Sequence, residues 1–206
     1  MVEPKWLEWA RKMQALAQNG LAYTESPYDR ERYHELREVA LEMLAAGSGA
    51  DMPALRELFA GETGYATPKV DVRGVVYQGD RILLVKEHVD GKWTLPGGWA
   101  DAWDTPSQAV EREIWEESGY RVRADKLLAC WDRRLHGHPP TAFRIYKLFF
   151  RCALLGGEPT KSMETDEIGF FAEGEVPELS LPRTTPWELA RLYEHMRNPE
   201  LPAEFD

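Results

Sequence analysis

The chain has 206 residues, 43% of them hydrophobic, so it is long enough to bury a core and to form one domain with an appendage. Its formal net charge of -10 argues against broad contact with a nucleic-acid backbone or an anionic membrane face, so an anionic substrate must be met by local cations or a metal ion. The N-terminal segment is charged throughout and no stretch approaches the ~20 apolar residues of a membrane span, which predicts a cytoplasmic protein.

Helices are predicted in the first third of the chain, because apolar residues recur there at intervals of three and four positions. This spacing places side chains on one face of a helix, and two such faces are expected to pack in a core. The first face is formed by Trp6, Trp9, Ala10, Met13, Leu16 and Ala17, and the second by Tyr33, Leu36, Ala40, Met43 and Leu44.

Local signals predict the ends of these helices. Ser26 followed by Pro27 supplies an N-cap and a first-turn proline for the second helix, and Gly47 is expected to end it. A third, shorter helix is predicted over residues 53–60. Together the three helices are predicted to form an N-terminal domain of residues 1–66.

From Lys69 the hydrophobic period changes to two, which predicts a strand with Val72 and Val76 on one face and Arg73 on the outward one. Only two helices interrupt the strands that follow, so residues 67–206 are predicted to form an α/β domain. Further strands are expected at residues 82–87, 92–95, 127–132 and 142–154, the last broken at Gly156, and a closing helix is expected to start with a capping box at Thr185.

The segment of residues 97–120 carries the pattern with chemical meaning. A capping box at Thr105 and a glycine stop at Gly119 delimit one helix of about four turns, preceded by a glycine-rich loop. At about 100° per residue, Glu113 and Glu117 lie one turn apart at the edge of the inward-facing stripe. The helix therefore presents a pair of carboxylates beside apolar residues.

A second pair on this helix, Arg112 and Glu116, is spaced to form an ion pair that holds a third carboxylate nearby. A solvated acidic face is the alternative; it accounts for Glu111 but accounts poorly for Glu117. Crowded carboxylates repel one another and persist mainly where a hard divalent cation neutralises them. The pattern predicts a site for Mg²⁺, with Mn²⁺ as an alternative, that hydrolyses a diphosphate with activated water.

These residues resemble the Nudix box, whose fixed positions include a glycine, a glutamate six residues later and a helical run with three glutamates. Asp104 stands where the family has its first glutamate, and we expect it to preserve a structural contact. The resemblance implies an α/β/α Nudix sandwich with a mixed sheet, preceded by the small helical domain. The fixed positions of the box are matched at every residue except Asp104 and are occupied here by Gly98, Asp104, Arg112, Glu113, Ile114, Glu116, Glu117, Gly119 and Tyr120.

The same resemblance implies roles for individual residues. Glu113 and Glu117 would be the principal metal ligands and would carry the catalysis. Glu116 would be a further ligand, and the Gly97 carbonyl a backbone ligand. Arg112 would orient the glutamates.

Other segments are similar to a bacterial Nudix subgroup that includes CDP-choline pyrophosphatases and is often labelled ADP-ribose pyrophosphatase. The similarity lies in the helical N-terminal block, PKVDVRGVV, the loop around WDRRLHGHPP and the ending EVPELSLPRTTP. It implies that the N-terminal helices assist formation of a homodimer and close over the substrate pocket.

Two polar loops supply secondary candidates. Glu167, in a loop with Glu164 and Asp166, is the candidate for a further metal ligand or the general base, and a solvated loop is the alternative. Arg133 and His136 are candidates for contacts to phosphate or base from a mobile substrate-side loop, and an ordinary surface loop is the alternative.

Three more residues are candidates for substrate binding. Arg73 and Arg183 are candidate phosphate clamps, because a guanidinium matches phosphate oxygens with paired donors; surface salt bridges are the alternative. Trp99, inside the glycine loop, would stack on a base, and core packing is the alternative.

The predicted reaction is attack by water on a phosphorus of a nucleoside diphosphate linked to another group, giving a nucleoside monophosphate and a phosphorylated remainder. CDP-choline and ADP-ribose are the leading substrates. The alternatives are a housecleaning pyrophosphatase for nucleoside triphosphates and a nucleotide-sugar sensor without turnover. Neither a nucleic acid nor a membrane is expected as a partner.

Overall fold

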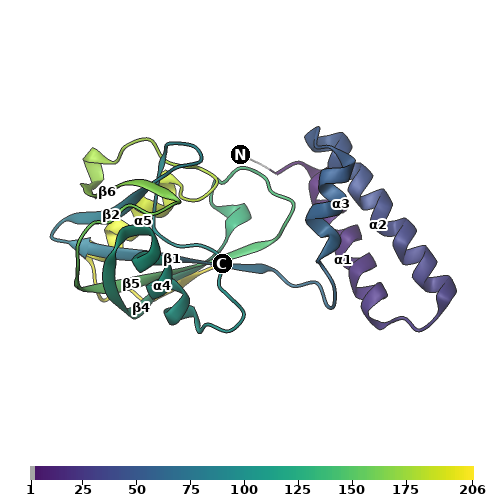
Figure 1. Ribbon diagram of the computed structural model, residues 1–206, viewed down its shortest axis with the longest axis horizontal. Helices are drawn as coiled ribbons and strands as arrows, with labels where there is room; N and C mark the ends of the chain where they lie inside the picture. Colours follow the sequence, from purple (N-terminus) through teal and green to yellow (C-terminus); the bar gives the residue numbers. More distant parts are fainter. Residues whose placement is uncertain (1–2) are drawn as a thin grey trace. The chain divides into compact units, whose positions relative to one another are not determined.

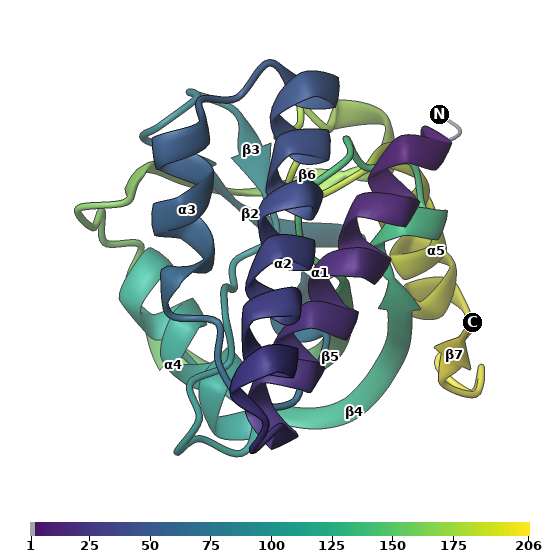
Figure 2. The ribbon, with the colours of Figure 1, turned by 90° about the vertical axis from the view of Figure 1, so that its right-hand side faces the viewer.

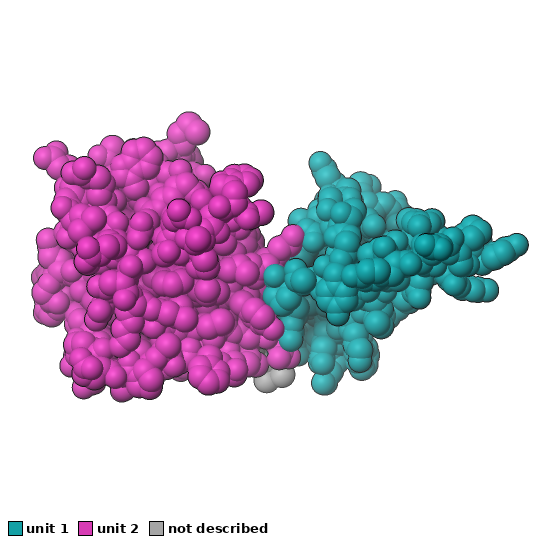
Figure 3. Space-filling model, turned by 90° about the horizontal axis from the view of Figure 1, so that it is seen from below, with its two compact units in different colours: residues 1–68, 140–144 teal, residues 69–139, 145–206 magenta. Residues whose placement is uncertain are grey.

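The computed structural model describes residues 3–206, which form two compact units (Figure 3). Unit 1 comprises Met1–Pro68 together with Pro140–Arg144, and unit 2 comprises Lys69–Pro139 and Ile145–Asp206. No helix within the described residues is long and apolar enough to cross a membrane.

Unit 1 is built from three helices, as predicted: α1 (Lys5–Tyr23), α2 (Pro27–Ser48) and α3 (Met52–Ala60). Helices α1 and α2 lie side by side (Figure 2). The segment of residues 140–144 adds Phe143 to this unit, with its ring centroid 5.1 Å from that of Phe59. The core comprises Leu7, Ala10, Leu41, Leu44, Leu55 and Phe59.

The inner face of α1 differs from the predicted one. Trp9 and Leu16 are 56% and 53% exposed, while Gln14 and Gln18 are buried. The glutamines tolerate burial because they are hydrogen-bonded: Gln14 donates to Gln18, which donates to the main-chain carbonyl of Gly64. The prediction of two apolar faces was therefore right for α2 and partly wrong for α1.

The end of α2 also differs. The N-cap prediction is confirmed, because Ser26 accepts a hydrogen bond from the Asp29 amide. The helix continues through Gly47 and ends at Gly49, which adopts a left-handed conformation with φ 74°. Gly47 instead gives room for the indole of Trp6, which a Cβ at this position would approach to 2.4 Å.

Unit 2 contains the mixed sheet that the sequence predicts. The strand order is β3-β2-β1-β5-β4-β7, with β6 also paired to β2; β1 runs parallel to β5 and β4 parallel to β7. The other pairings are antiparallel. The strands are β1 (Lys69–Gln78), β2 (Arg81–Glu87), β3 (Trp93–Thr94), β4 (Tyr120–Asp132), β5 (Ile145–Gly157), β6 (Thr165–Ala172) and β7 (Glu204–Phe205).

Two helices, α4 (Pro106–Ser118) and α5 (Pro186–Arg197), pack on this sheet (Figure 1). Val72 of β1 packs with Ile114 of α4, whereas Val75 of β1 packs with Leu189 of α5. Because β1 alternates between these two cores, the helices cover opposite faces of the sheet. This confirms the predicted α/β/α arrangement.

The expectation that Arg73 points outward is wrong, because helices cover both faces of the sheet. Arg73 lies on the same face of β1 as Val75, which packs with Leu189 of α5, and it is only 6% exposed. The alternation of polar and apolar residues in the sequence identifies the two faces of a strand, but it does not show whether a helix packs on the polar one.

Several strand boundaries were predicted incorrectly. β5 begins at Ile145 rather than at residue 142, since residues 140–144 belong to unit 1, and it continues through Gly156. β4 begins at Tyr120, directly after α4. Near the β4 irregularity at Ala124, the Ala124 amide donates to Glu111 at 2.8 Å, so Glu111 is more than a solvated side chain.

The capping predictions for α4 and α5 are confirmed. Thr105 and Thr185 both form complete capping boxes, and Gly119 ends α4 in the left-handed conformation with φ 75°. The short helical turns η1 (Arg133–Leu135) and η2 (Glu173–Glu175) complete the fold.

At Gly74, α4 packs so closely on β1 that there is no room for a side chain. A Cβ at this position would lie 2.2 Å from Ile114 Cδ1 and 3.3 Å from Val110 Cγ2. We expect Gly74→Ala to lower the free energy of unfolding by about 1–3 kcal/mol through overpacking, measured by urea denaturation. Gly61→Ala is the matched control, because open space surrounds Gly61 and its φ is -83°. Equal stability of the two variants would contradict the close approach.

Candidate active site

One guanidinium, that of Arg112, pairs with four carboxylates. Its Nε lies 3.0 Å from Asp104 and its Nη2 lies 3.1 Å from Asp101, both in the loop before α4. Its Nη1 lies 2.9 Å from Glu113 and 3.0 Å from Glu116. The predicted pair with Glu116 is therefore present, and Asp104 reaches Arg112 despite its shorter side chain. Asp101 was not identified from the sequence.

The glycine-rich loop lies against β1 and reaches the buried end of α4. The Gly97 amide donates to Glu117 Oε2 at 2.9 Å, and the Val72 amide donates to the Gly98 carbonyl at 2.9 Å. Gly97 has φ 137°, and a Cβ there would lie 2.0 Å from the Val72 carbonyl oxygen. Only glycine meets both requirements at this position. Close backbone approach thus brings the loop and Glu117 together.

Burial dominates the electrostatics of the two inward glutamates. The pKa of Glu117 is raised to about 8, mainly by burial and also by the nearby Glu113 and Glu87, against the opposing effects of Arg73 and the Gly97 amide. Burial also raises the pKa of Glu113, although Arg112 opposes the rise. Ionising both carboxylates together is therefore costly unless a further cation is present.

These carboxylates fit a hard divalent cation. Within residues 3–206 no three or more His, Cys, Asp or Glu side chains already converge as a ligand cluster. However, Glu117 meets Gly97, and Glu113 fills the space that a side chain at Gly98 would occupy, since a Cβ there would lie 2.9 Å from Glu113 Oε2. Two carboxylates, main-chain carbonyls and water are the donors that Mg²⁺ prefers.

Arg73 uses its donors within the protein. It bonds both carboxylate oxygens of Asp71, at 2.9 and 3.3 Å, and the Leu95 carbonyl at 3.1 Å. The Leu95 carbonyl lies two residues before Gly97, so Arg73 supports the glycine-rich loop. Its charge also favours the ionised form of Glu117.

Arg183 lies beside a buried carboxylate that was not identified from the sequence. Its Nε is 2.9 Å from Glu87 Oε1, and its Nη1 donates to Ser180 Oγ at 3.3 Å. The Arg183 side chain remains 31% exposed, whereas that of Glu87 is 7% exposed. Burial raises the pKa of Glu87, while Arg183 and Arg73 oppose the rise. The sequence signal for Glu87 was its position as a charged residue at the end of the apolar strand β2.

The other substrate-binding candidates have partners outside the carboxylate pair. Arg133 is buried and donates to the Pro139 carbonyl at 2.7 Å and the Pro182 carbonyl at 3.0 Å. The His136 ring stacks on Trp187 at 4.3 Å, and its Nε2 lies 2.9 Å from Asp206. The loop expected to be mobile is thus held by its side chains.

Glu167 lies in surroundings that differ from those expected, whereas for Trp99 the alternative of core packing is wrong and base stacking stays a prediction. Glu167 belongs to β6 rather than to a loop, and its carboxylate is 2.7 Å from Lys86 Nζ. Trp99 forms an isolated antiparallel bridge with Asp71, and its side chain is exposed rather than in the core.

A fully buried charge network lies beneath α5. Lys147 Nζ donates to Glu188 Oε1 at 2.8 Å, and His138 Nε2 lies 2.8 Å from the same oxygen. Although burial acts to raise it, the pKa of Glu188 is held at about 2 by Lys147 and His138. The sequence signal for this network was a lysine on the inward alternation of β5, between Ile145 and Phe149.

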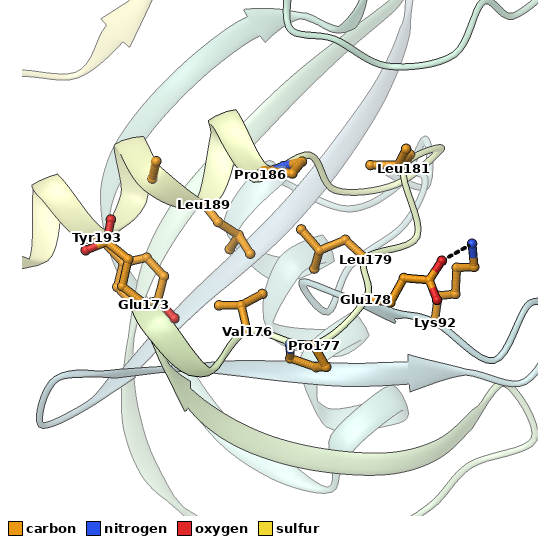
Figure 4. A pocket seen from close by; sticks show the side chains of 11 residues that line it. Lys92, Glu173, Val176, Pro177, Glu178, Leu179, Leu181, Pro186, Leu189 and Tyr193 are labelled. Atoms are coloured by element: carbon orange, nitrogen blue, oxygen red, sulfur yellow. Dashed lines mark ion pairs between the residues drawn. The ribbon is translucent and has the colours of Figure 1, made fainter.

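An apolar hollow of about 430 Å³ lies between α5 and the chain that follows η2 (Figure 4). None of its lining residues is among the predicted site residues, and the ion pair of Lys92 with Glu178 stands at one side. The apolar lining is formed by Val176, Pro177, Leu179, Leu181, Pro186, Leu189, Ala190 and Tyr193.

Comparison with known proteins covers both units. Residues 67–196 match the model of the NUDIX domain, and residues 4–59 match a model described as a UDP-X-like, N-terminal oligomerisation domain. The chain is 43% identical over 205 residues, 100% of its length and 99% of the relative's, to Bacillus subtilis (strain 168) YjhB, which is provisionally named an ADP-ribose pyrophosphatase.

Two solved structures are also similar. The crystal structure of an ADP-ribose pyrophosphatase from Streptococcus suis 89-1591 is 39% identical with a TM-score of 0.63, covering 68% of this chain and 100% of that one. The crystal structure of a UDP-X diphosphatase is 30% identical with a TM-score of 0.64, covering 98% of both chains.

The buried network predicts a pH-dependent stability. Because the folded-state pKa of Glu188, about 2, lies below its ordinary 4.5, the carboxylate stabilises the fold above about pH 4.5 and loses this effect as the pH falls through about 2. We expect Glu188→Gln to lower the free energy of unfolding by about 3 kcal/mol at pH 7, and this deficit to shrink between pH 4.5 and 2. Denaturant unfolding across this pH range measures it.

The control for this prediction is Glu178→Gln. The Glu178 carboxylate pairs with Lys92 at 2.6 Å but is 76% exposed, so its loss should cost under about 1 kcal/mol. A deficit for Glu188→Gln that stays constant down to pH 2 would contradict the assigned pKa.

Proposed function

The chain belongs to the Nudix family of hydrolases, and we propose that it cleaves the diphosphate bond of a nucleoside diphosphate linked to another group, releasing a nucleoside monophosphate and a phosphorylated remainder. The observation that carries this proposal is the meeting of Glu113 and Glu117 with the Gly97–Gly98 turn. Such a site suits a substrate whose phosphates share a divalent cation with the protein.

Glu113 and Glu117 would hold Mg²⁺ or Mn²⁺, with Glu116 and the Gly97 carbonyl as further ligands. When bound, the cation supplies charge neutralisation, polarised phosphoryl oxygens and an acidified water. Arg112 keeps two loop carboxylates, Asp101 and Asp104, as partners at 3.1 and 3.0 Å, so it stays in place if the helical glutamates turn towards a cation.

Two arginines would act on the substrate phosphates in different ways. Arg183, with its partly exposed guanidinium beside Glu87, would bind phosphate oxygens directly. Arg73, whose donors are engaged with Asp71 and Leu95, would contribute its positive charge and the placement of the loop. Arg133, His136 and Trp99 would shape the surrounding substrate pocket.

A carboxylate would accept the proton of the attacking water, and two are candidates. Glu117 is buried beside the glycine-rich loop, where its Oε2 accepts a hydrogen bond from the Gly97 amide. Glu167 pairs with Lys86, which would have to release it before it could act as a base. We favour Glu117, because a main-chain amide rather than a lysine holds its carboxylate.

The helical domain proposed for residues 1–66 would form a homodimer and close over the substrate. Its support is the family description of residues 4–59 as an oligomerisation domain, together with exposed aromatic side chains on α1 and α2. Trp9, Tyr23 and Tyr28 are 56%, 72% and 72% exposed. Exposed aromatic residues of this kind are enriched at protein interfaces.

The substrate is tested by hydrolysis of a panel in the presence of Mg²⁺, with products separated by chromatography. The panel contains ADP-ribose, CDP-choline, UDP-glucose and deoxynucleoside triphosphates. We expect an ADP-ribose-like or other nucleoside diphosphate-linked compound to yield a monophosphate, and EDTA to abolish the reaction. Preferential cleavage of triphosphates would instead support the housecleaning alternative. Thermal stabilisation by a ligand without any cleavage would support a sensor.

The proton acceptor is tested by comparing Glu117→Gln with Glu167→Gln. We expect Glu117→Gln to lower kcat by at least about 100-fold while the protein stays folded, because it removes both a charge and a base. Glu167→Gln should keep kcat within about threefold, since the pair with Lys86 is exposed. The reverse order of effects would transfer the role to Glu167.

A further inference from the structure

Three consecutive main-chain carbonyls, those of residues 181–183, each accept a hydrogen bond from a different basic side chain. All three donors are buried. The residues that accept these bonds form a turn without helix or strand pairing, so side chains replace a hydrogen-bonding ladder there. The bonds join His138 Nδ1 to the Leu181 carbonyl at 2.8 Å, Arg133 Nη2 to Pro182 at 3.0 Å and Lys147 Nζ to Arg183 at 2.5 Å.

The same turn is tied to the segment that leads into the glycine-rich loop. Thr184 Oγ1 lies 2.9 Å from Thr94 Oγ1 and accepts from the Leu95 amide at 3.1 Å. The Ser180 amide donates to the Trp93 carbonyl at 2.8 Å. The turn is therefore held on one side by three buried basic residues and on the other by β3.

Burying three basic side chains to hold a turn costs free energy. This cost suggests that the position of a residue in the turn matters for function. Burying Lys147 requires desolvation of a full charge, which Glu188 compensates from α5. The Arg183 side chain extends from the turn to Glu87, and its Nε lies 2.9 Å from Glu87 Oε1. Glu87 in turn acts on the pKa of Glu117.

We propose that Lys147, Arg133 and His138 are positioning residues for Arg183. They hold its main chain so that its guanidinium stands at the Glu87 edge of the site, oriented for a substrate phosphate before the substrate arrives. Pre-orientation lowers the entropy cost of binding, so their loss should weaken substrate binding more than it slows the chemical step. This inference rests on the proposed function, since it assigns Arg183 to a phosphate of the same substrate.

A double-mutant cycle between Lys147→Met and Arg183→Ala tests the proposal, with ADP-ribose as substrate. We expect Lys147→Met to raise KM about fivefold to tenfold with kcat changed less than about threefold, and to change KM less than about twofold when Arg183 is already alanine. A merely structural role would give equal effects in both backgrounds, and that result would overturn the proposal.

The matched control is Lys126→Met. Lys126 Nζ also donates to two main-chain carbonyls, those of Pro199 and Leu201, at 2.6 and 2.7 Å, but these lie next to β7 at the sheet edge. Its replacement should leave KM unchanged in both backgrounds. An equal rise in KM for this variant would also contradict a role specific to the turn.

Folding and turnover are controlled separately. Lys147→Met removes the buried lysine that pairs with Glu188, so circular dichroism checks the fold. Arg133→Gln enters the same cycle if that variant unfolds. If the wild type does not cleave ADP-ribose, the proposed activity on this compound fails, and the cycle is read on the Kd of ADP-ribose by calorimetry. Equal loss of affinity in both backgrounds, or none, overturns the positioning role in that case.

Discussion

The site depends on one guanidinium held among four carboxylates. Arg112 joins Asp101 and Asp104 of the loop to Glu113 and Glu116 of α4, so it fixes the loop on the helix. One positive charge does not neutralise four negative ones, and the excess makes this end of α4 suited to further cations. The residues that form these ion pairs are therefore also those proposed to hold a cation.

Close packing decides where that excess charge lies. Gly97 touches the β1 backbone, and Gly74 of β1 gives room to Ile114 of α4, so helix, strand and loop meet with little space between them. Glu117 is buried at this junction, which is why its pKa rises and why a cation there would interact with it strongly. A buried carboxylate of this kind attracts a cation more strongly than a carboxylate on an open surface does.

Two buried ion pairs also lie in this domain, and each pairs a basic residue with a carboxylate. Arg73 rests on Asp71, and Lys147 rests on Glu188, both pairs on the α5 face of the sheet. Side chains that seemed free to bind phosphate, such as Arg73 and Arg133, instead bond neighbouring parts of the protein. These two basic residues therefore shape the site through their contacts with the protein.

By itself the sequence determined what depends on neighbours within one turn or one strand. The capping box of α4, the shared face of Glu113 and Glu117, the pair of Arg112 with Glu116 and the family resemblance all follow from spacings of a few residues. Only the tertiary structure decided the burial of Arg73, the partner of Glu87, and the network of Lys147 with Glu188, whose members are 41 residues apart. Spacing along the chain carries no record of which distant segments pack together, and those contacts set burial, charge compensation and therefore the chemistry of each side chain.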